Sequence, residues 1–436
     1  MDGLLVLSMV LVVAGGLGVL LGRWSVTMPI VFVLAGVLLN LTGLLQIELN
    51  HETARSLTEA TLVMLLFADA STLSVNKIRE DVGLPARLLG IGLPLTIAAG
   101  ALVAWLLFPG EGLGFALLIA TILAPTDAAL GLPIFINRSV PVRIRRALNV
   151  ESGLNDGLAT PFITLFIAFA VSQERPGSGD WLTSALLQIG LAVVAGVVVG
   201  AVGGRLLVLA RKRKWTQGAP LQFAVLGLAF AAYLGSIAIG GNGFVAAFVG
   251  GLTFRRATRG RLSEAAEYTE TTGTLLSLFV WTLFGIAFVV PHVLQGFDWR
   301  PVVYAVASLT VVRMLPVALS LIGVHLRPDT QAIMGWFGPR GLASVIFTLM
   351  AIDALEGAGK ETQLLASVAT WTILLSVFAH GLSAVPLAGW YARRLKTSGP
   401  DVPELQDMSE IHTRHQTVLG GNGARNGGEG HPEPAH

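Results

Sequence analysis

The sequence lacks cysteine altogether and is poor in charged residues. With no cysteine among 436 residues, disulfide bonds and cysteine ligands to a metal are excluded. Aspartate, glutamate, lysine and arginine make up 13% of the chain, whereas soluble domains carry about 25%. Hydrophobic residues make up 53% of the chain. This composition predicts a membrane protein rather than a soluble domain.

Apolar windows long enough to cross a bilayer recur along the whole chain. Each crossing needs about 20 mostly apolar residues in one helix. Thirteen such windows are present, so the sequence predicts an all-α polytopic membrane protein with about 13 transmembrane helices. The windows cover residues 3–22, 26–45, 57–75, 87–108, 112–135, 147–172, 182–204, 220–237, 243–254, 271–291, 301–323, 331–352 and 364–390.

The basic residues of the loops predict the orientation of these helices. If the N-terminus lies outside, 21 of the 29 lysines and arginines fall in cytoplasmic loops and four fall in the opposite loops. An excess of basic residues marks the cytoplasmic side, which predicts an N-out/C-in topology in a cell membrane. Residues 1–396 then form the transmembrane domain. Residues 397–436 are polar and glycine-rich, which predicts a disordered cytoplasmic tail.

A polar stripe lies inside the sixth window. At 3.6 residues per turn, Ser152 and Asp156 share one helix face, and Glu151 and Asn155 share the adjoining face. A carboxylate within a membrane helix costs roughly 2.5–3.5 kcal/mol on insertion scales, so it faces a cavity or a partner. The stripe therefore predicts a site for a cation or a proton.

Two other windows contain features that interrupt helices. The fifth contains Pro125 two residues before Asp127, and the twelfth contains Gly338, Pro339 and Gly341 around Arg340. Proline removes a backbone donor and clashes with the preceding turn. The twelfth window comes seven after the fifth, an odd offset, so the interrupted helices run in opposite directions, as in the inverted repeats of transporters. The alternative is that these prolines are simply tolerated within continuous membrane helices.

Several charged residues are predicted to lie in one layer near the middle of the membrane. Counting 1.5 Å per residue from the window ends places Asp127 and Asp156 at similar depths, with Asp69 and Arg313 close to the same layer. Carboxylates and a guanidinium in one layer are suited to a buried ion site. For Glu151 an alternative is a first-turn acid that stabilises a helix N-terminus.

These motifs together resemble those of the monovalent cation:proton antiporters of the NhaP-like group. Any one of them is short, but five occur in family order between about residues 60 and 390. The matching stretches are Pro-Thr-Asp at 125–127, Glu-Ser-Gly-Leu-Asn-Asp at 151–156, Ser-Leu-Thr-Val-Val-Arg at 308–313, Gly-Pro-Arg-Gly at 338–341 and His-Gly-Leu-Ser-Ala-Val-Pro-Leu at 380–387.

The resemblance implies two crossing broken helices in a core domain, a separate dimerisation domain, a homodimer and elevator-like alternating access. It implies that Asp156 is the central carboxylate that binds the cation or the proton. Thr126, Asp127 and Ser152 are implied as further oxygen ligands of the monovalent cation. Asp69 matches an acidic position whose role varies within the family.

The resemblance also implies a structural ion pair. Glu151 matches the carboxylate that pairs with a buried arginine, for which Arg313 is the first choice and Arg340, beside the second crossing, is the other. In this family an Asn-Asp pair goes with electroneutral exchange, and this chain has Asn155 followed by Asp156.

The sequence thus predicts a secondary-active antiporter that exchanges Na⁺, or alternatively Li⁺ or K⁺, for H⁺ one for one. Oxygen-rich sites suit such hard cations. No cofactor motif is visible, and no nucleic-acid partner is expected; the expected surroundings are membrane lipid. The alternatives are a cation channel, a cation/proton symporter, or an intramembrane aspartyl protease that uses Asp127 and Asp156 as a dyad.

Overall fold

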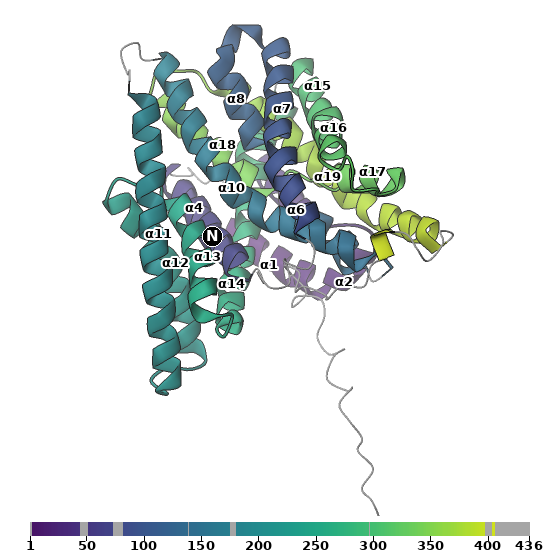
Figure 1. The fold of residues 1–436 in the computed structure, drawn as a ribbon. Helices are drawn as coiled ribbons and strands as arrows, with labels where there is room; N and C mark the ends of the chain where they lie inside the picture. Colours follow the sequence, from purple (N-terminus) through teal and green to yellow (C-terminus); the bar gives the residue numbers. More distant parts are fainter. Residues whose placement is uncertain are drawn as a thin grey trace, which may run out of the picture.

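A computed structural model describes residues 2–43, 51–72, 82–137, 139–174, 180–295, 297–396 and 403–405 (Figure 1). Every regular element within these ranges is a helix. A helix satisfies its own backbone hydrogen bonds, which a chain surrounded by lipid has to do. The predicted tail, apart from residues 403–405, lies outside the described residues, as do residues 44–45 and 73–75 at the ends of two predicted windows.

Within the described residues, seven helical stretches are long and apolar enough to cross a membrane. They are α6 Gly83–Arg87 continued by η2 Leu88–Gly92 and α7 Leu93–Leu107; α10 Val142–Glu174; α11 Trp181–Lys212; α12 Ala219–Ala238; α14 Ser263–Phe284 continued by η4 Gly285–Leu294; α15 Trp299–Leu309 with α16 Val311–Ser320; and α19 Gln363–Lys396.

The other predicted windows contain helices that are shorter or more polar, alone or in pairs. They are α1 Asp2–Gly16 with α2 Gly18–Arg23, α3 Met28–Leu41, α4 His51–Thr72, α8 Gly112–Ile122 with α9 Ala128–Ile136, α13 Gly243–Thr258, and α17 Pro328–Trp336 with α18 Leu342–Glu356. Short 3₁₀ turns occur at η3 Pro109–Glu111 and η5 Pro403–Leu405. Every predicted window therefore overlaps helix, and the all-α class is confirmed. The number of crossings and the N-out orientation stay predictions.

Contacts between helices divide the chain into two bodies. The panel body consists of α3, α4, α11–α14 and η4, and the core body consists of α6–α10, η2 and α15–α19. Packing between the bodies is sparser than packing within them. It includes contacts of α10 with α4 and with α13, and contacts of α19 with η4. In Figure 1, α11–α14 gather on one side of the molecule, while α15–α17 lie on the other.

Proline alone does not decide where a helix is interrupted. Pro161, Pro316 and Pro386 lie inside continuous helices. The fifth and twelfth windows, in contrast, are each split into two helices, as predicted from Pro125 and Pro339. An interruption at Thr310, between α15 and α16, was not predicted. It leaves Arg313 in the first turn of α16.

Candidate functional site

The two interrupted segments meet inside the core body. The link between α8 and α9 contains Pro125, and the link between α17 and α18 contains Pro339. The Asp127 N–H donates to the Pro339 carbonyl at 2.8 Å, and the Ser344 hydroxyl of α18 donates to the Ile122 carbonyl of α8 at 2.8 Å. The unwound backbones thus satisfy each other, which explains how two breaks can lie buried.

Asp127 holds the N-termini of two half-helices. Its Oδ1 accepts from the Ala129 N–H of α9 at 2.8 Å, and its Oδ2 accepts from the Leu342 N–H of α18 at 3.0 Å. Each N-terminus carries a partial positive charge and unpaired N–H groups, which a carboxylate stabilises. One side chain therefore caps both repeats. A carboxylate has about four acceptor sites, so these two bonds leave Asp127 acceptor capacity for a cation.

The polar stripe of α10 packs against the first crossing. The Oγ atoms of Thr126 and Ser152 lie 3.3 Å apart, and the Asn155 side-chain amide donates to the Thr126 hydroxyl. All three residues are buried. Within the described residues, the buried Oδ1 of Asn155 meets no hydrogen-bond donor. An unpaired buried acceptor is costly, and a cation would satisfy it.

Asp156 follows Asn155 on the same buried part of α10. Its side chain is 8% exposed, and its backbone carbonyl accepts from the Thr160 hydroxyl at 2.8 Å. It lies one turn beyond Ser152, on the same helix face. The structure therefore brings Thr126, Ser152 and Asn155 into direct contact, with Asp156 one residue further along the helix.

Glu151 and Arg313 form a buried ion pair. Arg313 Nη2 lies 2.6 Å from Glu151 Oε1, and both side chains are at most 3% exposed. The contact joins α10 to the first turn of α16. The alternative that Glu151 is a first-turn acid is wrong, because α10 begins at Val142. The second oxygen, Oε2, has no hydrogen-bond partner among the described residues.

Arg340 has a different set of partners. It is fully buried, and its guanidinium donates to the Gly338 carbonyl at 2.7 Å and the Ser308 carbonyl at 3.3 Å. Its own backbone N–H donates to the Ser376 hydroxyl at 2.6 Å. The positive charge thus lies beside the Gly338 carbonyl, which follows the C-terminus of α17, and the Ser308 carbonyl in the last turn of α15. Both helix ends carry the negative end of a helix dipole. Asp127 and Arg340 therefore compensate opposite helix ends at the crossing.

Asp69 lies in the panel body. It is 6% exposed and belongs to α4, which packs against α10 and α18. Its part in ion binding stays a prediction. The partners that sequence reasoning missed are Leu342, Ser344, Ser308 and Ser376. Ser344 is a hydroxyl residue close to the second predicted break, which was a signal in the sequence; the other three gave none, since their partners depend on how distant segments cross.

A cavity of about 700 Å³ leads from the predicted outer surface toward the crossing. Its wall runs from Lys360, in the loop before α19, to Val345 in α18. Val345 is one turn beyond Leu342, whose N–H binds Asp127. Residues of α4, α14 and η4 form the opposite wall. The cavity therefore lies between the panel body and the core body.

Two glycines of α10 provide a matched test of this packing. A Cβ atom at Gly157, next to Asp156, would lie 2.1 Å from the Phe248 ring of α13, whereas a Cβ at Gly153 would meet nothing within 4 Å. We expect Gly157→Ala to destabilise the protein by about 1–3 kcal/mol through overpacking. Gly153→Ala should be neutral or stabilise it by roughly 0.5–1 kcal/mol. The thermal unfolding midpoints of the two purified variants test this, and equal midpoints would contradict the tight contact.

Residues 6–390 match the family model for the transmembrane region of sodium/hydrogen exchangers. The K(+)/H(+) antiporter NhaP of Alkalimonas amylolytica is 29% identical over 385 residues, which cover 85% of this chain and 64% of that relative. The Na(+)/H(+) antiporter of Schizosaccharomyces pombe is 27% identical over 343 residues, which cover 70% of this chain and 72% of that relative. This chain thus spans slightly less than two thirds of the length of the first of these two relatives.

The fold is similar to that of a solved transporter. The sodium proton antiporter MjNhaP1 from Methanocaldococcus jannaschii superimposes with a TM-score of 0.68. The match covers 91% of this chain and 99% of that chain, at 19% sequence identity. The likeness establishes a shared arrangement of helices.

Proposed function

This chain belongs to the sodium/hydrogen exchanger family of multi-pass membrane transporters, and from that premise we propose that it exchanges a monovalent cation for a proton. The observation that carries the proposal is the buried cluster of oxygens at the crossing. Thr126 and Ser152 contribute hydroxyls, Asn155 contributes an acceptor without a donor among the described residues, and Asp156 is the adjacent carboxylate. Such hard oxygen ligands suit Na⁺, Li⁺ or K⁺.

Competition for Asp156 would couple the two fluxes. The charge of a buried carboxylate is costly, and either a proton or a bound cation can neutralise it. The two cannot occupy the same charge at once, so binding of the cation requires release of the proton. When the site then opens to the other side of the membrane, the exchange runs in reverse. This coupling needs no separate gate.

The neighbouring groups support one-for-one, electroneutral exchange. The Glu151 carboxylate is paired with Arg313, and both oxygens of Asp127 accept from backbone amides. Asn155 has no ionisable group. Asp156 is then the group of this cluster whose charge changes during the cycle. Each turnover would move one cation and one proton in opposite directions.

Alternating access would arise from movement of the core body relative to the panel body. The cavity between the two bodies extends from the predicted outer side to Val345, one turn beyond Leu342 at the crossing. At its rim, Arg55 of the panel body lies 3.0 Å from Asp353 of the core body. An elevator-like movement would break this exposed bridge, which exposed pairs allow at a cost of about 0–1 kcal/mol.

In the proposed homodimer, a second copy of the chain or lipid would lie against the panel body. Only 22% of the most apolar window of α11 is buried within the chain. A helix with so much apolar surface suits a lipid-facing position or a contact between copies. The dimer and its interface are part of this proposal.

Transport by purified protein in liposomes tests the proposed function. An imposed pH gradient should collapse when Na⁺, Li⁺ or K⁺ is added, and the ion that acts at the lowest concentration is the substrate. Sodium is the first expectation, although the relatives above are named for K⁺ and for Na⁺. The rate should be unchanged when a potassium/valinomycin clamp sets the membrane potential.

The same assay separates the alternatives. Proton movement in the same direction as the cation would indicate a symporter, and cation flux without proton movement would indicate a channel. Exchange that depends on the membrane potential would mean that a second group titrates, and Asp69 and Asp127 would be examined next. The protease alternative is disfavoured by membership of a transporter family and by the capping role of Asp127.

A further inference from the structure

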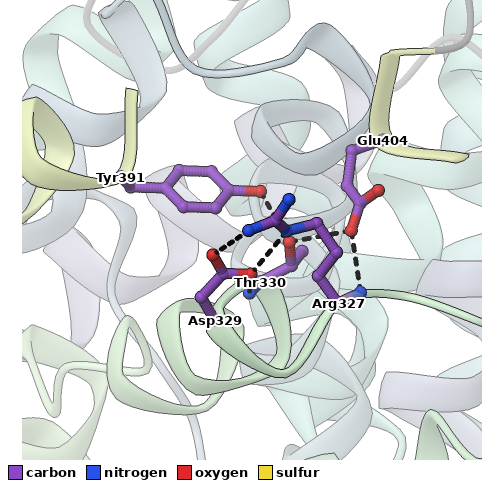
Figure 2. A network of polar contacts seen from close by, with 5 residues as sticks. All are labelled: Arg327, Asp329, Thr330, Tyr391 and Glu404. Atoms are coloured by element: carbon purple, nitrogen blue, oxygen red, sulfur yellow. Dashed lines mark hydrogen bonds and ion pairs between the residues drawn. The ribbon is translucent and has the colours of Figure 1, made fainter. Parts of the chain in front are cut away.

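A short turn within the predicted tail is docked on the cytoplasmic end of the core body. Pro403–Leu405 form the 3₁₀ turn η5, and Glu404 at its centre is fully buried. Figure 2 shows the Glu404 carboxylate and the Tyr391 hydroxyl of α19 on either side of Thr330, in the first turn of α17. Burial of an acidic side chain is rare unless it is paired, so this contact calls for an explanation.

Glu404 satisfies the N-terminus of α17. Its Oε1 accepts from the Arg327 N–H at 2.9 Å and from the Thr330 hydroxyl at 2.9 Å. The Thr330 hydroxyl also lies 2.9 Å from the Tyr391 hydroxyl. Because Thr330 has one proton, which it gives to Glu404, the Tyr391 hydroxyl donates to Thr330. A carboxylate at this position also stabilises the positive end of the helix dipole.

Other contacts fix the same corner of the molecule. The Arg143 side chain of α10 donates to the Pro403 carbonyl at 2.8 Å. Beside Glu404, Arg327 pairs with Asp329 at 2.8 Å. This bond from Arg327 is the main cause that lowers the pKa of Asp329, so the pair persists as the pH falls into the mildly acidic range. The turn thus connects α10, α17 and α19, which all belong to the core body.

We propose that Pro403–Leu405 act as a cytoplasmic clasp that positions α17, and through α17 the crossing where the cation binds. Helix α17 has nine residues and runs from the clasp to Trp336. The chain continues directly into the second break, where the Pro339 carbonyl accepts the Asp127 N–H. A helix this short transmits displacement of one end to the other. The clasp is therefore part of the transport core, although it lies beyond α19 in the sequence.

This inference rests on the proposed function for its transport readout. Two truncations form a matched pair: a chain ending after residue 410 keeps the clasp, and a chain ending after residue 402 loses it. The shorter chain should need about fivefold more cation for half-maximal exchange, near the lower end of typical coupling between sites. The chain ending after residue 410 should behave like the full chain. The maximal exchange rate should change little in either truncated chain.

Point variants separate positioning from a general loss of stability. Glu404→Ala should raise the half-saturating cation concentration by as much as ending the chain after residue 402 does. Glu404→Gln keeps an acceptor oxygen for the Arg327 N–H and the Thr330 hydroxyl, so it should recover most of the affinity. The positioning role would be overturned if the full chain, the chain ending after residue 402 and Glu404→Ala all had the same half-saturating cation concentration.

Docking itself can be measured without transport, because the chain contains no cysteine. Pro403→Cys introduces a single thiol at the clasp while leaving the backbone carbonyl that Arg143 binds. In the otherwise unchanged chain, alkylation of this thiol by a polar maleimide should be slow. When Glu404→Ala is added, alkylation should become about as fast as that of Lys212→Cys, the exposed control. Equal rates with and without Glu404→Ala would overturn the clasp. If the full chain moves no cation, the proposed function fails, whereas the alkylation rates still decide whether the clasp exists.

Discussion

Replacing Asp156 by asparagine is expected to reduce cation-driven proton movement to the level of protein-free liposomes. The amide has nearly the same size as the carboxylate, but it can neither release a proton nor neutralise a bound cation. Asp156 is 8% exposed and lies beside the Thr126–Ser152–Asn155 cluster. Removal of a buried charge should not destabilise the fold, so Asp156→Asn should purify with an unchanged elution profile and thermal midpoint.

The control for this variant is the same substitution at an exposed position. Asp180 precedes α11, is exposed, and makes no side-chain capping bond. Asp180→Asn should therefore retain the exchange rate of the unchanged protein in the same liposomes. Near-normal exchange by Asp156→Asn would contradict the proposed coupling mechanism and move the proton-binding group elsewhere.

Loss of either member of the Glu151–Arg313 pair is expected to reduce the yield of folded protein more than cation affinity. The two side chains are almost fully buried and 2.6 Å apart. Removing one partner leaves a buried charge uncompensated, which costs about 3–5 kcal/mol. That loss is a large fraction of the roughly 5–15 kcal/mol by which native proteins are stable. Glu151→Gln and Arg313→Ala should each lower the thermal midpoint and the monodisperse fraction after purification.

A double variant shows whether the effect arises from the pair itself. In Glu151→Gln combined with Arg313→Gln, neither side chain carries a charge, so the penalty of an unpaired ion disappears. This double variant should be more stable than either single variant, because the effects of substitutions at residues in contact are not additive. Single variants that are stable but bind the cation with altered affinity would instead place Glu151 and Arg313 in the ion site.

The positions of the helices and of the two breaks could be predicted from local sequence. Long apolar windows are strong signals, and in the fifth and twelfth windows a proline is accompanied by polar or glycine residues that tolerate an unwound backbone. Pro161, Pro316 and Pro386, in contrast, lie in helices that continue past them. The all-α class and the family were likewise predicted, and both are confirmed.

The partners of the site residues were less accessible to sequence reasoning. The Asp127–Leu342 bond joins residues 215 positions apart, and its existence depends on how the two breaks cross. Counting residues along the helices predicted a depth for Asp127 but could not show that both of its carboxylate oxygens cap helices. Arg313 was the first choice as the partner of Glu151, but the interruption at Thr310, which leaves Arg313 in the first turn of α16, involves no proline and was not predicted.

The docked turn at Pro403–Leu405 was hidden for a different reason. Its surroundings are polar and low in apolar residues, which is the composition of disordered segments. Its contacts are hydrogen bonds to a helix N-terminus and to Arg143, and such contacts leave no periodic pattern in the sequence. Only the three-dimensional position of α17 brings the acceptor and its donors together.

If a cation and a proton compete for Asp156, binding of the cation must release the proton, and this release can be measured. Purified protein in weakly buffered detergent solution with a pH indicator dye would be titrated with Na⁺, Li⁺ and K⁺. Competition for Asp156 predicts that each bound cation releases one proton per chain and that Asp156→Asn releases none. Cation binding without proton release, or full release from Asp156→Asn, would contradict it.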